Sequence, residues 1–544
     1  MNSFENFSGE EKRKLSPYVT NMDQSIFVLH NLPEVIKGAL FSRYSRSKLG
    51  LRSLLLKEFM ESGDSHFQSI TGQSASTGSE NSLLSIQKAQ DFYDRVLDGY
   101  GDDSIAELGG AHLAVENVSM IATKHIEDAR IGGSPLEKST RYIYFDEKIN
   151  GDYLFYKEPK LLSSSHKECY LSTCRALFDT YVNCIPILSK YVEKILPTET
   201  GVTDRAHKAS LRARVCDSLR GLLPASTLTN MGVFGNGRFF ESLIQKLRLS
   251  PLAEMQEIAD SSFQELSKVI PSFVRRGQKE HRHFEAWKQF QNAQKQHLIS
   301  FASSIKPQAL LKNTNFKDLS SVILTDHTVD AEHKVAAALL FEQTDISLSQ
   351  LLKLTRTFSN EELQKLFKGA HLPRSNRRHK PPRALEHAEY TFDLLGDFGI
   401  YRDLHRHRQL TQERQILSTR CGFDMPSDIQ NSGLEKVWKE AMEKAAHAYE
   451  TIAKDFPVEA QYVVPMAYNI RWYFKANLRS LVWLCELRST PQGHLNYRKM
   501  AQDIARAVMK THPLLAPFFK FVDFHNYDLG RLSSEIRQDQ KNNF

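Results

Sequence analysis

Two segments of the chain, 279 residues apart, show the same alternation of apolar and polar side chains. An apolar residue at every second position is typical of a β-strand with one buried face. We therefore expect a strand in each segment. The alternating apolar positions are Ala111, Leu113 and Val115 in the first segment and Tyr390, Phe392 and Leu394 in the second.

A helix is expected after each of these strands. In the second segment Asp397 is a plausible N-cap, and Ile400 and Leu404 are four residues apart, so both would lie on one buried face. This helix is expected to end in three consecutive basic residues, Arg406, His407 and Arg408.

The end of the first helix is marked by residues that break regular structure. Gly132, Gly133 and Pro135 follow it closely and predict a loop. This loop would carry three polar residues at alternate positions, Glu137, Ser139 and Arg141.

The polar residues around these elements recur at fixed spacing, which indicates an internal repeat. In a first group each residue recurs 279 positions later, and in a second group 241 positions later. The first group pairs Glu107 with Glu386, Ser139 with Ser418 and Arg141 with Arg420. The second group pairs Pro224 with Pro465, Asn236 with Asn477 and Arg238 with Arg479.

This repeat predicts an α+β fold made by tandem duplication, with a small antiparallel sheet and packed helices in each half. We expect the first half at residues 1–274, a helical connector at 275–314 and the second half at 315–544. A Ser- and Gly-rich stretch at 61–82 is expected to form a surface loop. The aromatic residues Trp472, Phe474 and Trp483 are expected in the core.

Composition narrows the class of protein. The 544 residues carry a net charge of +7 that is spread along the chain, so nucleic acid is not an expected partner. Six cysteines without CxxC spacing do not require a disulfide framework, and no cluster has the spacing of a metal site. The chain lacks a signal-peptide core and any apolar run of about 18 residues. We expect a cytoplasmic protein without a membrane partner.

The order of these motifs resembles the flavin-dependent thymidylate synthases, the ThyX family, and in particular the long, divergent tandem form of chlamydia-type bacteria. The motifs are Glu-His, a strand, a helix ending in Arg-His-Arg, a loop with Glu-x-Ser-x-Arg-Tyr, then Arg-x-x-Leu-Pro, Asn-x-Arg and a late arginine. The resemblance implies methylation of dUMP to dTMP at C5, with FAD as cofactor and with NADPH and methylenetetrahydrofolate as co-substrates. It also implies a homodimer of this tandem chain, equivalent to the family's tetramer of single copies.

Each half has lost a different part of this pattern. The first half keeps the loop with Arg141 and keeps Arg220, but Glu127 and Asp128 stand where the family has basic residues. The second half keeps Arg-His-Arg, whereas the loop glutamate is replaced by Ile416 and the arginine equivalent to Arg220 is Gln461. Because the family builds each active site between subunits, the resemblance implies one complete site formed by both halves and one degenerate site.

The resemblance also implies roles for individual residues. A guanidinium fork meets phosphate oxygens at two points, which suits Arg141 and Arg220 to the nucleotide phosphate. Arg488 would be the catalytic residue, because it would stabilise the negative charge that develops on the activated uracil. The expected dUMP-binding residues are Glu137, Ser139, Arg141, Arg220, Arg406 and Arg488. The expected FAD-binding residues are Glu386, Arg406, His407, Arg408, Asn477, Arg479 and His494.

Other interpretations stay open from the sequence. Arg406, His407 and Arg408 are also compatible with an exposed helical face, and Ser139 with Arg141 is compatible with simple turn chemistry. A related modification of a uracil nucleotide, such as hydroxymethylation, would use the same site. A non-catalytic nucleotide-binding protein would keep the fold without turnover.

Overall fold

The computed structural model describes residues 6–45, 47–60, 107–197, 202–281, 284–305 and 321–542. The predicted surface loop at 61–82 lies outside these residues. The chain divides into two compact units: the first contains residues of the first copy and of the expected connector, whereas the second contains residues of both copies. The first unit comprises Met1–Val118, His125–Glu137 and Thr229–Ala309, and the second comprises Ser119–Lys124, Lys138–Leu228 and Leu310–Phe544.

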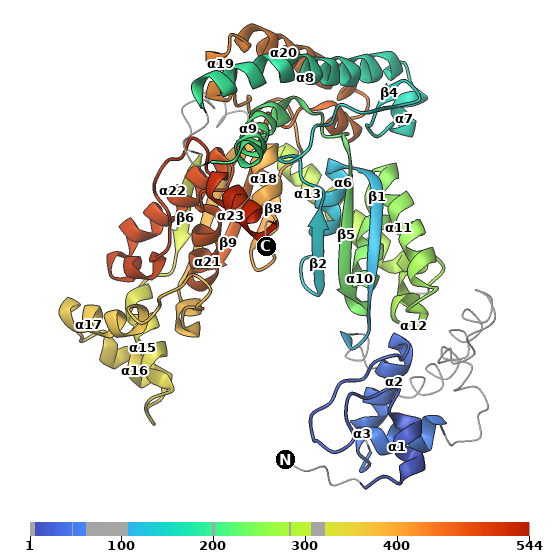
Figure 1. Cartoon of the computed structure of the whole chain (residues 1–544), viewed down its shortest axis with the longest axis vertical. Coiled ribbons are helices and arrows are strands. Elements are labelled where there is room, and N and C mark those ends of the chain that lie inside the picture. The colour runs from blue at the N-terminus through green and yellow to red at the C-terminus, as the bar shows by residue number, and fades with distance from the viewer. Residues whose placement is uncertain are drawn as a thin grey trace. The chain divides into compact units, whose positions relative to one another are not determined.

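The first unit contains a three-stranded sheet in the order β1-β5-β2 (Figure 1). Its strands are β1 (Gly110–Ser119), β2 (Gly133–Glu137) and β5 (Leu228–Asn236). Its main helices are α1 (Gly9–Leu15), α2 (Glu34–Tyr44), α3 (Leu51–Leu54), α10 (Gly237–Arg248), α11 (Ala253–Leu266), α12 (Pro271–Val274) and α13 (Phe284–Ser304). Helix α13 lies in the stretch where a helical connector was expected, while the boundaries of that connector stay a prediction.

The loop was predicted to begin at Gly132, Gly133 and Pro135, and this position is wrong. The residues from Gly133 to Glu137 form strand β2, which pairs antiparallel with β5. Pro135 is tolerated because β2 is at the edge of the sheet, where a backbone nitrogen can face away from the neighbouring strand. Gly132 supplies the positive φ of 88° that turns the chain into this strand. The loop that carries Ser139 and Arg141 therefore starts only after Glu137.

The second unit is built on a four-stranded antiparallel sheet in the order β6-β7-β9-β8. Its strands are β6 (Val322–His327), β7 (Glu389–Asp397), β8 (Thr411–Arg414) and β9 (Asn469–Asn477). Phe392 lies opposite Phe474 and Leu394 opposite Trp472, and all four side chains are buried. The predicted alternation of β7 is therefore confirmed, whereas Trp483 is 44% exposed and was wrongly expected in the core.

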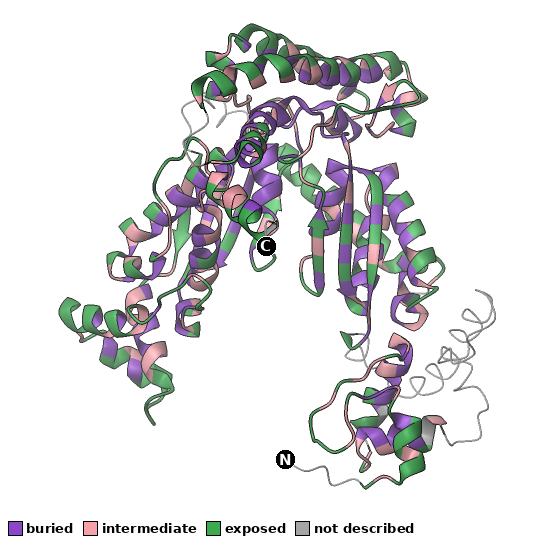
Figure 2. Ribbon diagram, viewed as in Figure 1, coloured by how far each residue is buried: buried purple, intermediate pink, exposed green. Residues whose placement is uncertain are grey.

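Helices surround this sheet in the second unit. Helix α6 (Met120–Glu127) spans the boundary between the two units. The others include α8 (Lys167–Ile195), α9 (Asp204–Leu219), α15 (Ala331–Phe341), α16 (Leu348–Thr355), α17 (Asn360–His371), α18 (Phe398–Leu404), α20 (Glu435–Ile452), α21 (Leu478–Arg488), α22 (Leu495–Thr511) and α23 (Leu532–Asn542). Figure 2 shows many buried positions in β7, β9 and α9, while α8 and α20 carry many exposed positions. No helix within the described residues is long and apolar enough to span a bilayer.

The N-terminus of α18 is as predicted, but its C-terminus is not. The Asp397 carboxylate accepts a hydrogen bond from the Ile400 amide at 2.9 Å, which confirms the N-cap. The helix ends at Leu404, so Arg406, His407 and Arg408 lie in the turn that follows it. The chain must leave the helix there because Thr411 begins the strand that pairs with β9.

The two copies have the same order of elements, which confirms the tandem duplication. In each copy a strand leads into a helix (β1 into α6, β7 into α18), and a later strand leads into another (β5 into α10, β9 into α21). Strands β5 and β9 begin and end exactly 241 residues apart, as the sequence repeat requires.

Equivalent segments of the two copies pair with each other inside the second unit. The Ala225 amide donates to the Val464 carbonyl at 2.8 Å, and the Met466 amide donates to the Leu223 carbonyl at 2.9 Å. Since Ala225 matches Met466 and Leu223 matches Val464 in the repeat, the two hydrogen bonds are reciprocal, as at a two-fold interface. Helices α8 and α20 pack together in the second unit and lie side by side in Figure 1.

Candidate functional site

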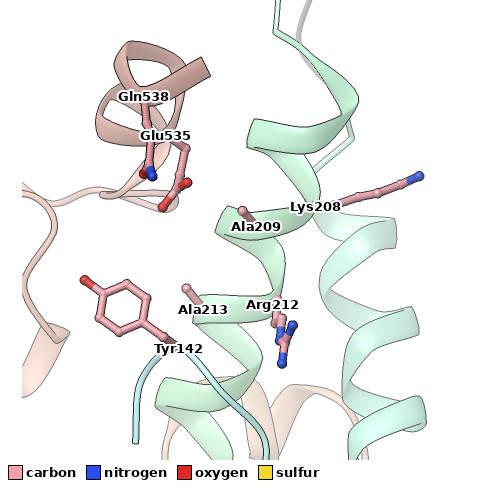
Figure 3. A pocket seen from close by; sticks show the side chains of 7 residues that line it. All are labelled: Tyr142, Lys208, Ala209, Arg212, Ala213, Glu535 and Gln538. Carbon is pink, nitrogen blue, oxygen red and sulfur yellow. The ribbon is translucent and has the colours of Figure 1, made fainter. Parts of the chain in front are cut away.

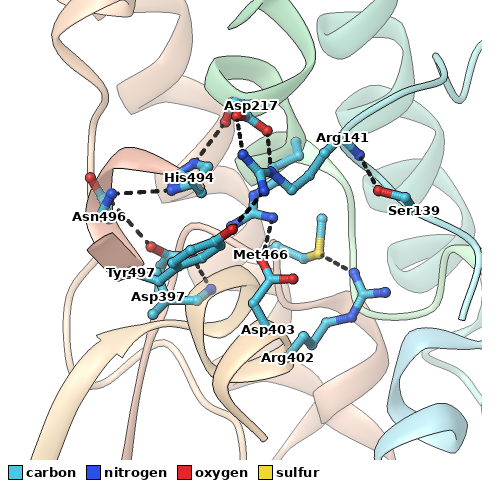
Figure 4. A network of polar contacts seen from close by, with 12 residues as sticks. Ser139, Arg141, Asp217, Asp397, Arg402, Asp403, Met466, His494, Asn496 and Tyr497 are labelled. Atoms are coloured by element: carbon cyan, nitrogen blue, oxygen red, sulfur yellow. Dashed lines mark hydrogen bonds and ion pairs between the residues drawn. The ribbon is translucent and has the colours of Figure 1, made fainter. Parts of the chain in front are cut away.

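A buried arginine of the first copy is held by residues of both copies. Arg141 donates from Nε and Nη2 to the two carboxylate oxygens of Asp217, each at 2.7 Å, and from Nη1 to the Tyr497 hydroxyl at 2.8 Å (Figure 4). The Ser139 hydroxyl accepts the Arg141 amide at 3.2 Å, which fixes the turn. Burial alone would raise the pKa of Asp217, but the adjoining Arg141 guanidinium outweighs it and holds that pKa well below its usual range.

A second buried arginine joins the two copies directly. Arg220, in the short 3-10 helix Arg220–Leu222, donates from Nη1 to the Asp403 carboxylate on α18 at 3.0 Å. Only 4% of Arg220 is exposed. Within the described residues its Nη2 has no hydrogen-bond partner. A buried guanidinium with an unused donor is a favourable place for an anionic ligand.

Gly399, in the first turn of α18, allows this close approach. A Cβ at this position would lie 3.1 Å from both Cζ and Nε of Arg220 and 2.9 Å from Oδ1 of Asp397. A larger residue would therefore push α18 away from Arg220.

The Arg-His-Arg segment places its histidine against a third arginine. Arg488, at the end of α21, donates from Nε to Nε2 of His407 at 2.9 Å. His407 is thus an acceptor at Nε2 and is neutral, because burial and the neighbouring Arg488 lower its pKa. The guanidinium of Arg488 lies 5.6 Å from the Tyr497 ring centre, and that of Arg141 lies 5.3 Å from it. Tyr497 on α22 therefore links the two arginines.

The two flanking arginines of this motif differ in their surroundings. Nη2 of Arg406 lies 3.9 Å from Oδ1 of Asp403, and its side chain is about one-third exposed. Arg408 is exposed at the surface of the turn. The two arginines therefore extend the cluster from the buried Arg220–Asp403 pair toward solvent.

The cluster has an excess of positive charge. Two carboxylates, Asp217 and Asp403, have depressed pKa values; for Asp403 the effect of burial is again outweighed by Arg220. They face more guanidinium groups than they can neutralise, namely Arg141, Arg220, Arg406, Arg488 and Arg531. Such an excess in a largely buried site fits an anion with about two negative charges.

His494 lies beside the nucleotide-binding candidates. It caps α22 by accepting the Asn496 amide at Nδ1, and its Nε2 lies 3.3 Å from the Asp217 carbonyl. Burial lowers its pKa to about 3, so it is neutral and donates from Nε2. Both ring nitrogens are thus engaged by the chain itself, and a contact with cofactor would have to replace one of these bonds.

Glu386, Asn477 and Arg479 form a separate group. Arg479 donates to Glu386 at 2.7 Å, and Asn477 caps α21 by accepting the Ser480 amide at 2.9 Å. Among the described residues, no direct hydrogen bond or ion pair joins this group to Arg141, Arg220 or Arg488.

The equivalent group in the first copy has the same geometry. Arg238 donates to Glu107 at 2.8 Å, and Asn236 caps α10 by accepting the Phe239 amide at 2.9 Å. The group therefore persists in the copy that has Glu127 and Asp128 in place of basic residues, while FAD binding by Glu386, Asn477 and Arg479 stays a prediction.

Glu137 is buried at the end of β2 and belongs to the first unit. Its predicted hydrogen bond to the sugar of the nucleotide stays a prediction. The remaining expected nucleotide-binding residues all belong to the second unit, where the contacts above bring them together.

The equivalent loop of the second copy makes different side-chain contacts. Ser418 accepts the Arg420 amide at 3.4 Å, so the turn is the same, but Arg420 is exposed and pairs with Glu450 at 3.3 Å. Gln461, in the place of Arg220, accepts the Leu417 amide at 3.2 Å and donates to the Val458 carbonyl at 2.9 Å. Gln461 therefore supports its own loop.

Four residues of the site were missed in the sequence: Asp217, Asp403, Tyr497 and Arg531. One signal was available for the first, because Asp217 precedes Arg220 by three residues, just as Asp403 precedes Arg406. A carboxylate at this spacing is a potential partner for the arginine that follows it, although Asp217 pairs with Arg141 and not with Arg220. Nothing in the sequence links Tyr497 or Arg531 to Arg141.

The fold and the site define a class of protein: a tandem α+β repeat with one buried arginine cluster made by both copies. A family model described as "Thymidylate synthase complementing protein" matches the chain twice, at residues 61–272 and 323–514. The chain belongs to this family.

Similar proteins cover the chain to different extents. A UPF0159 protein of Chlamydia muridarum is 50% identical over 532 residues, which is 98% of both chains. A UPF0159 protein of Thermoplasma acidophilum is 33% identical over 93% of this chain and 99% of its own. A flavin-dependent thymidylate synthase of Geobacter sulfurreducens is 27% identical over 205 residues, which is 36% of this chain and 84% of that protein. The last match is thus about the size of one copy.

The N-cap of α18 should make stability depend on pH. Burial raises the pKa of Asp397 to about 7, above its ordinary value of 3.8. Between these values the folded protein keeps a proton that the unfolded chain has lost, so the contribution of Asp397 to stability should fall as the pH rises from about 4 to about 7. Asp397→Asn keeps a capping side chain and should remove this dependence. Urea unfolding of both proteins across this range measures it, with Asp503→Asn on α22 as the control; parallel stability curves would contradict the assignment.

Proposed function

We propose that the protein is an FAD-dependent thymidylate synthase that converts dUMP to dTMP, with methylenetetrahydrofolate as carbon donor and NADPH as reductant. Each chain would have one composite active site. The observation that carries the proposal is the convergence of Arg141 and Arg220 from the first copy with His407 and Arg488 from the second, inside one compact unit.

The nucleotide phosphate would bind at Arg141 and Arg220. Both guanidinium groups are buried, and each donates to a carboxylate. Two oxygens of a phosphate can accept the same hydrogen bonds as the two oxygens of a carboxylate. The Ser139 turn keeps the Arg141 backbone in place. Arg406, 3.9 Å from Asp403, would add to the positive charge on this side of the site.

The residues of the Arg-His-Arg segment fit the pyrophosphate of FAD. Arg408 is exposed and Arg406 is partly exposed, so both can reach an anionic group that lies at the surface of the turn. When bound, the flavin supplies hydride chemistry. Glu386, Asn477 and Arg479 would act mainly by holding α21, and through it Arg488, in position.

Arg488 would be the residue that acts on the uracil. Its Nε is oriented by His407, and the Tyr497 ring supports the guanidinium. Since these contacts use one edge of the guanidinium, its remaining N–H groups can face a uracil carbonyl. A positive group fixed there in advance stabilises negative charge as it develops on the ring.

A combined flavin and turnover experiment tests the proposal. The purified chain should show the absorption spectrum of bound flavin and should release tritium from dUMP labelled at C5, in a reaction that requires methylenetetrahydrofolate and NADPH. Bound flavin and tritium release with a product other than dTMP would identify a related uracil modification. Absence of both flavin and turnover would refute the enzyme assignment.

Arg408→Ala should weaken flavin binding. The exposed guanidinium would lose a charge-assisted hydrogen bond to the pyrophosphate, which corresponds to roughly a tenfold to hundredfold weaker affinity. Flavin fluorescence titration of the apoprotein measures this effect. Arg506→Ala is the control, because Arg506 is an exposed arginine on α22 that pairs with Asp503. Equal flavin affinity in both variants would place the pyrophosphate elsewhere.

A further inference from the structure

The C-terminal segment after residue 514 lies beyond the second family match and contacts the nucleotide site. Its helix α23 packs on α9, and the two helices flank a pocket that Tyr142 also lines (Figure 3). Asp539 anchors α23 to the start of α9, because it accepts the Thr203 hydroxyl and pairs with Arg205 at 3.2 Å. Gly530 passes so close to Pro491 that a Cβ there would collide with its carbonyl oxygen.

These contacts place Arg531 against the back of the Arg141 loop. Its Nη1 donates to the Arg141 carbonyl at 2.9 Å, and its guanidinium lies 4.3 Å from the centre of the Tyr142 ring. Its Nη2 lies 3.7 Å from Oδ2 of Asp217 and, among the described residues, has no hydrogen-bond partner. Arg531 is only 6% exposed. Nη2 of Arg531 is therefore an unused buried donor beside Asp217, whose two oxygens already accept hydrogen bonds from Arg141.

The occupied carboxylate creates a difficulty for ligand binding. Asp217 takes Nε and Nη2 of Arg141, and the other edge of the guanidinium donates to the Tyr497 hydroxyl and, at 3.3 Å, to the Gln492 carbonyl. A phosphate can therefore bind this guanidinium at two points only if the groups on one edge give way, and Asp217 is the group that has a second cation beside it. A buried carboxylate that loses its partner is strongly destabilising. For the phosphate to bind well, another cation must therefore neutralise the negative charge of Asp217.

We propose that Arg531 is the positioning residue that takes over Asp217 when a phosphate monoester binds Arg141. The carboxylate needs to move by only about 1 Å to bring the present 3.7 Å separation from Nη2 to hydrogen-bond length. The exchange keeps Asp217 paired in both states and frees the fork of Arg141 for the ligand. This inference rests on the proposed function, because it takes the phosphate of dUMP as the ligand of Arg141.

A double-mutant cycle tests the exchange with dUMP and deoxyuridine, which lacks the phosphate. Arg531→Ala should weaken dUMP binding by about tenfold or more and leave deoxyuridine binding unchanged, while Arg531→Lys should recover part of the loss. In the Asp217→Asn background, Arg531→Ala should change dUMP affinity by less than about twofold, since no charge then needs compensation. Arg537→Ala is the control for folding of α23, because Arg537 is an exposed arginine on that helix.

The outcomes separate this inference from the proposed function. The same loss of dUMP affinity with aspartate or asparagine at 217 would show that Arg531 does not act through that carboxylate and would overturn the exchange alone. An equal loss for deoxyuridine would reduce Arg531 to a structural support and would also overturn it. A wild-type chain that binds no dUMP would overturn both the exchange and the proposed function.

Discussion

Replacing Arg141 with alanine is expected to abolish dUMP binding and leave flavin bound. The substitution removes a buried fork that Asp217 and Tyr497 hold in place for a phosphate. Truncating one partner of such a buried charge pair costs about 2–5 kcal/mol, or roughly a 30-fold to several-thousand-fold loss of affinity. Calorimetric titration with dUMP measures the loss, and the flavin spectrum of the same sample shows whether flavin still binds.

Arg420→Ala provides a matched control for this result. Arg420 is the equivalent residue of the second copy and makes the same turn with Ser418, but its side chain is exposed and paired with Glu450. Exposed ion pairs contribute little, so dUMP affinity should be unchanged. If Arg420→Ala were as damaging as Arg141→Ala, both loops would bind nucleotide and the assignment of one complete site would be wrong.

Arg220→Gln is the second substitution with a large expected effect. The substitution gives the first copy the residue that the second copy has at Gln461. It also removes the 3.0 Å ion pair of the buried Asp403 and leaves Arg406, at 3.9 Å, as its nearest cation. We expect loss of dUMP binding and, because a buried carboxylate loses its main partner, a stability loss of about 3–5 kcal/mol. Denaturant unfolding at neutral pH measures the second effect. The double variant Arg220→Gln with Asp403→Asn should recover stability without recovering dUMP binding.

Gln461→Ala is the control for Arg220. Gln461 makes two hydrogen bonds within its own loop, so its loss should cost about 1–3 kcal/mol of stability and leave dUMP affinity intact. Equal loss of dUMP binding in Arg220→Gln and Gln461→Ala would contradict the account of one working site.

Local patterns in the sequence were sufficient to predict the repeat and its main elements. Strand β7 and the N-cap at Asp397 follow from spacing and residue type alone, because these signals act within a few residues. Strand β2 and the end of α18 could not be predicted in this way. Each depends on pairing with a distant strand, which makes Pro135 compatible with a strand and ends α18 before the three basic residues.

The residues of the site also divide into those that the sequence predicts and those that it does not. Arg141, Arg220, His407 and Arg488 were found from motif order, and the structure brings them together within one unit. Their partners were not found, because the hydrogen bond between Arg141 and Tyr497 crosses 356 positions and the one between Arg531 and Arg141 crosses 390. Contacts between residues so far apart leave no periodic signal in a single sequence.

Each chain is expected to have one nucleotide site built from both copies. Calorimetric titration of the purified full-length chain with dUMP tests it most directly, because the titration reports the number of sites per chain. The account predicts one dUMP bound per chain, and none after Arg141→Ala. Two dUMP molecules per chain, or one that remains after Arg141→Ala, would contradict it.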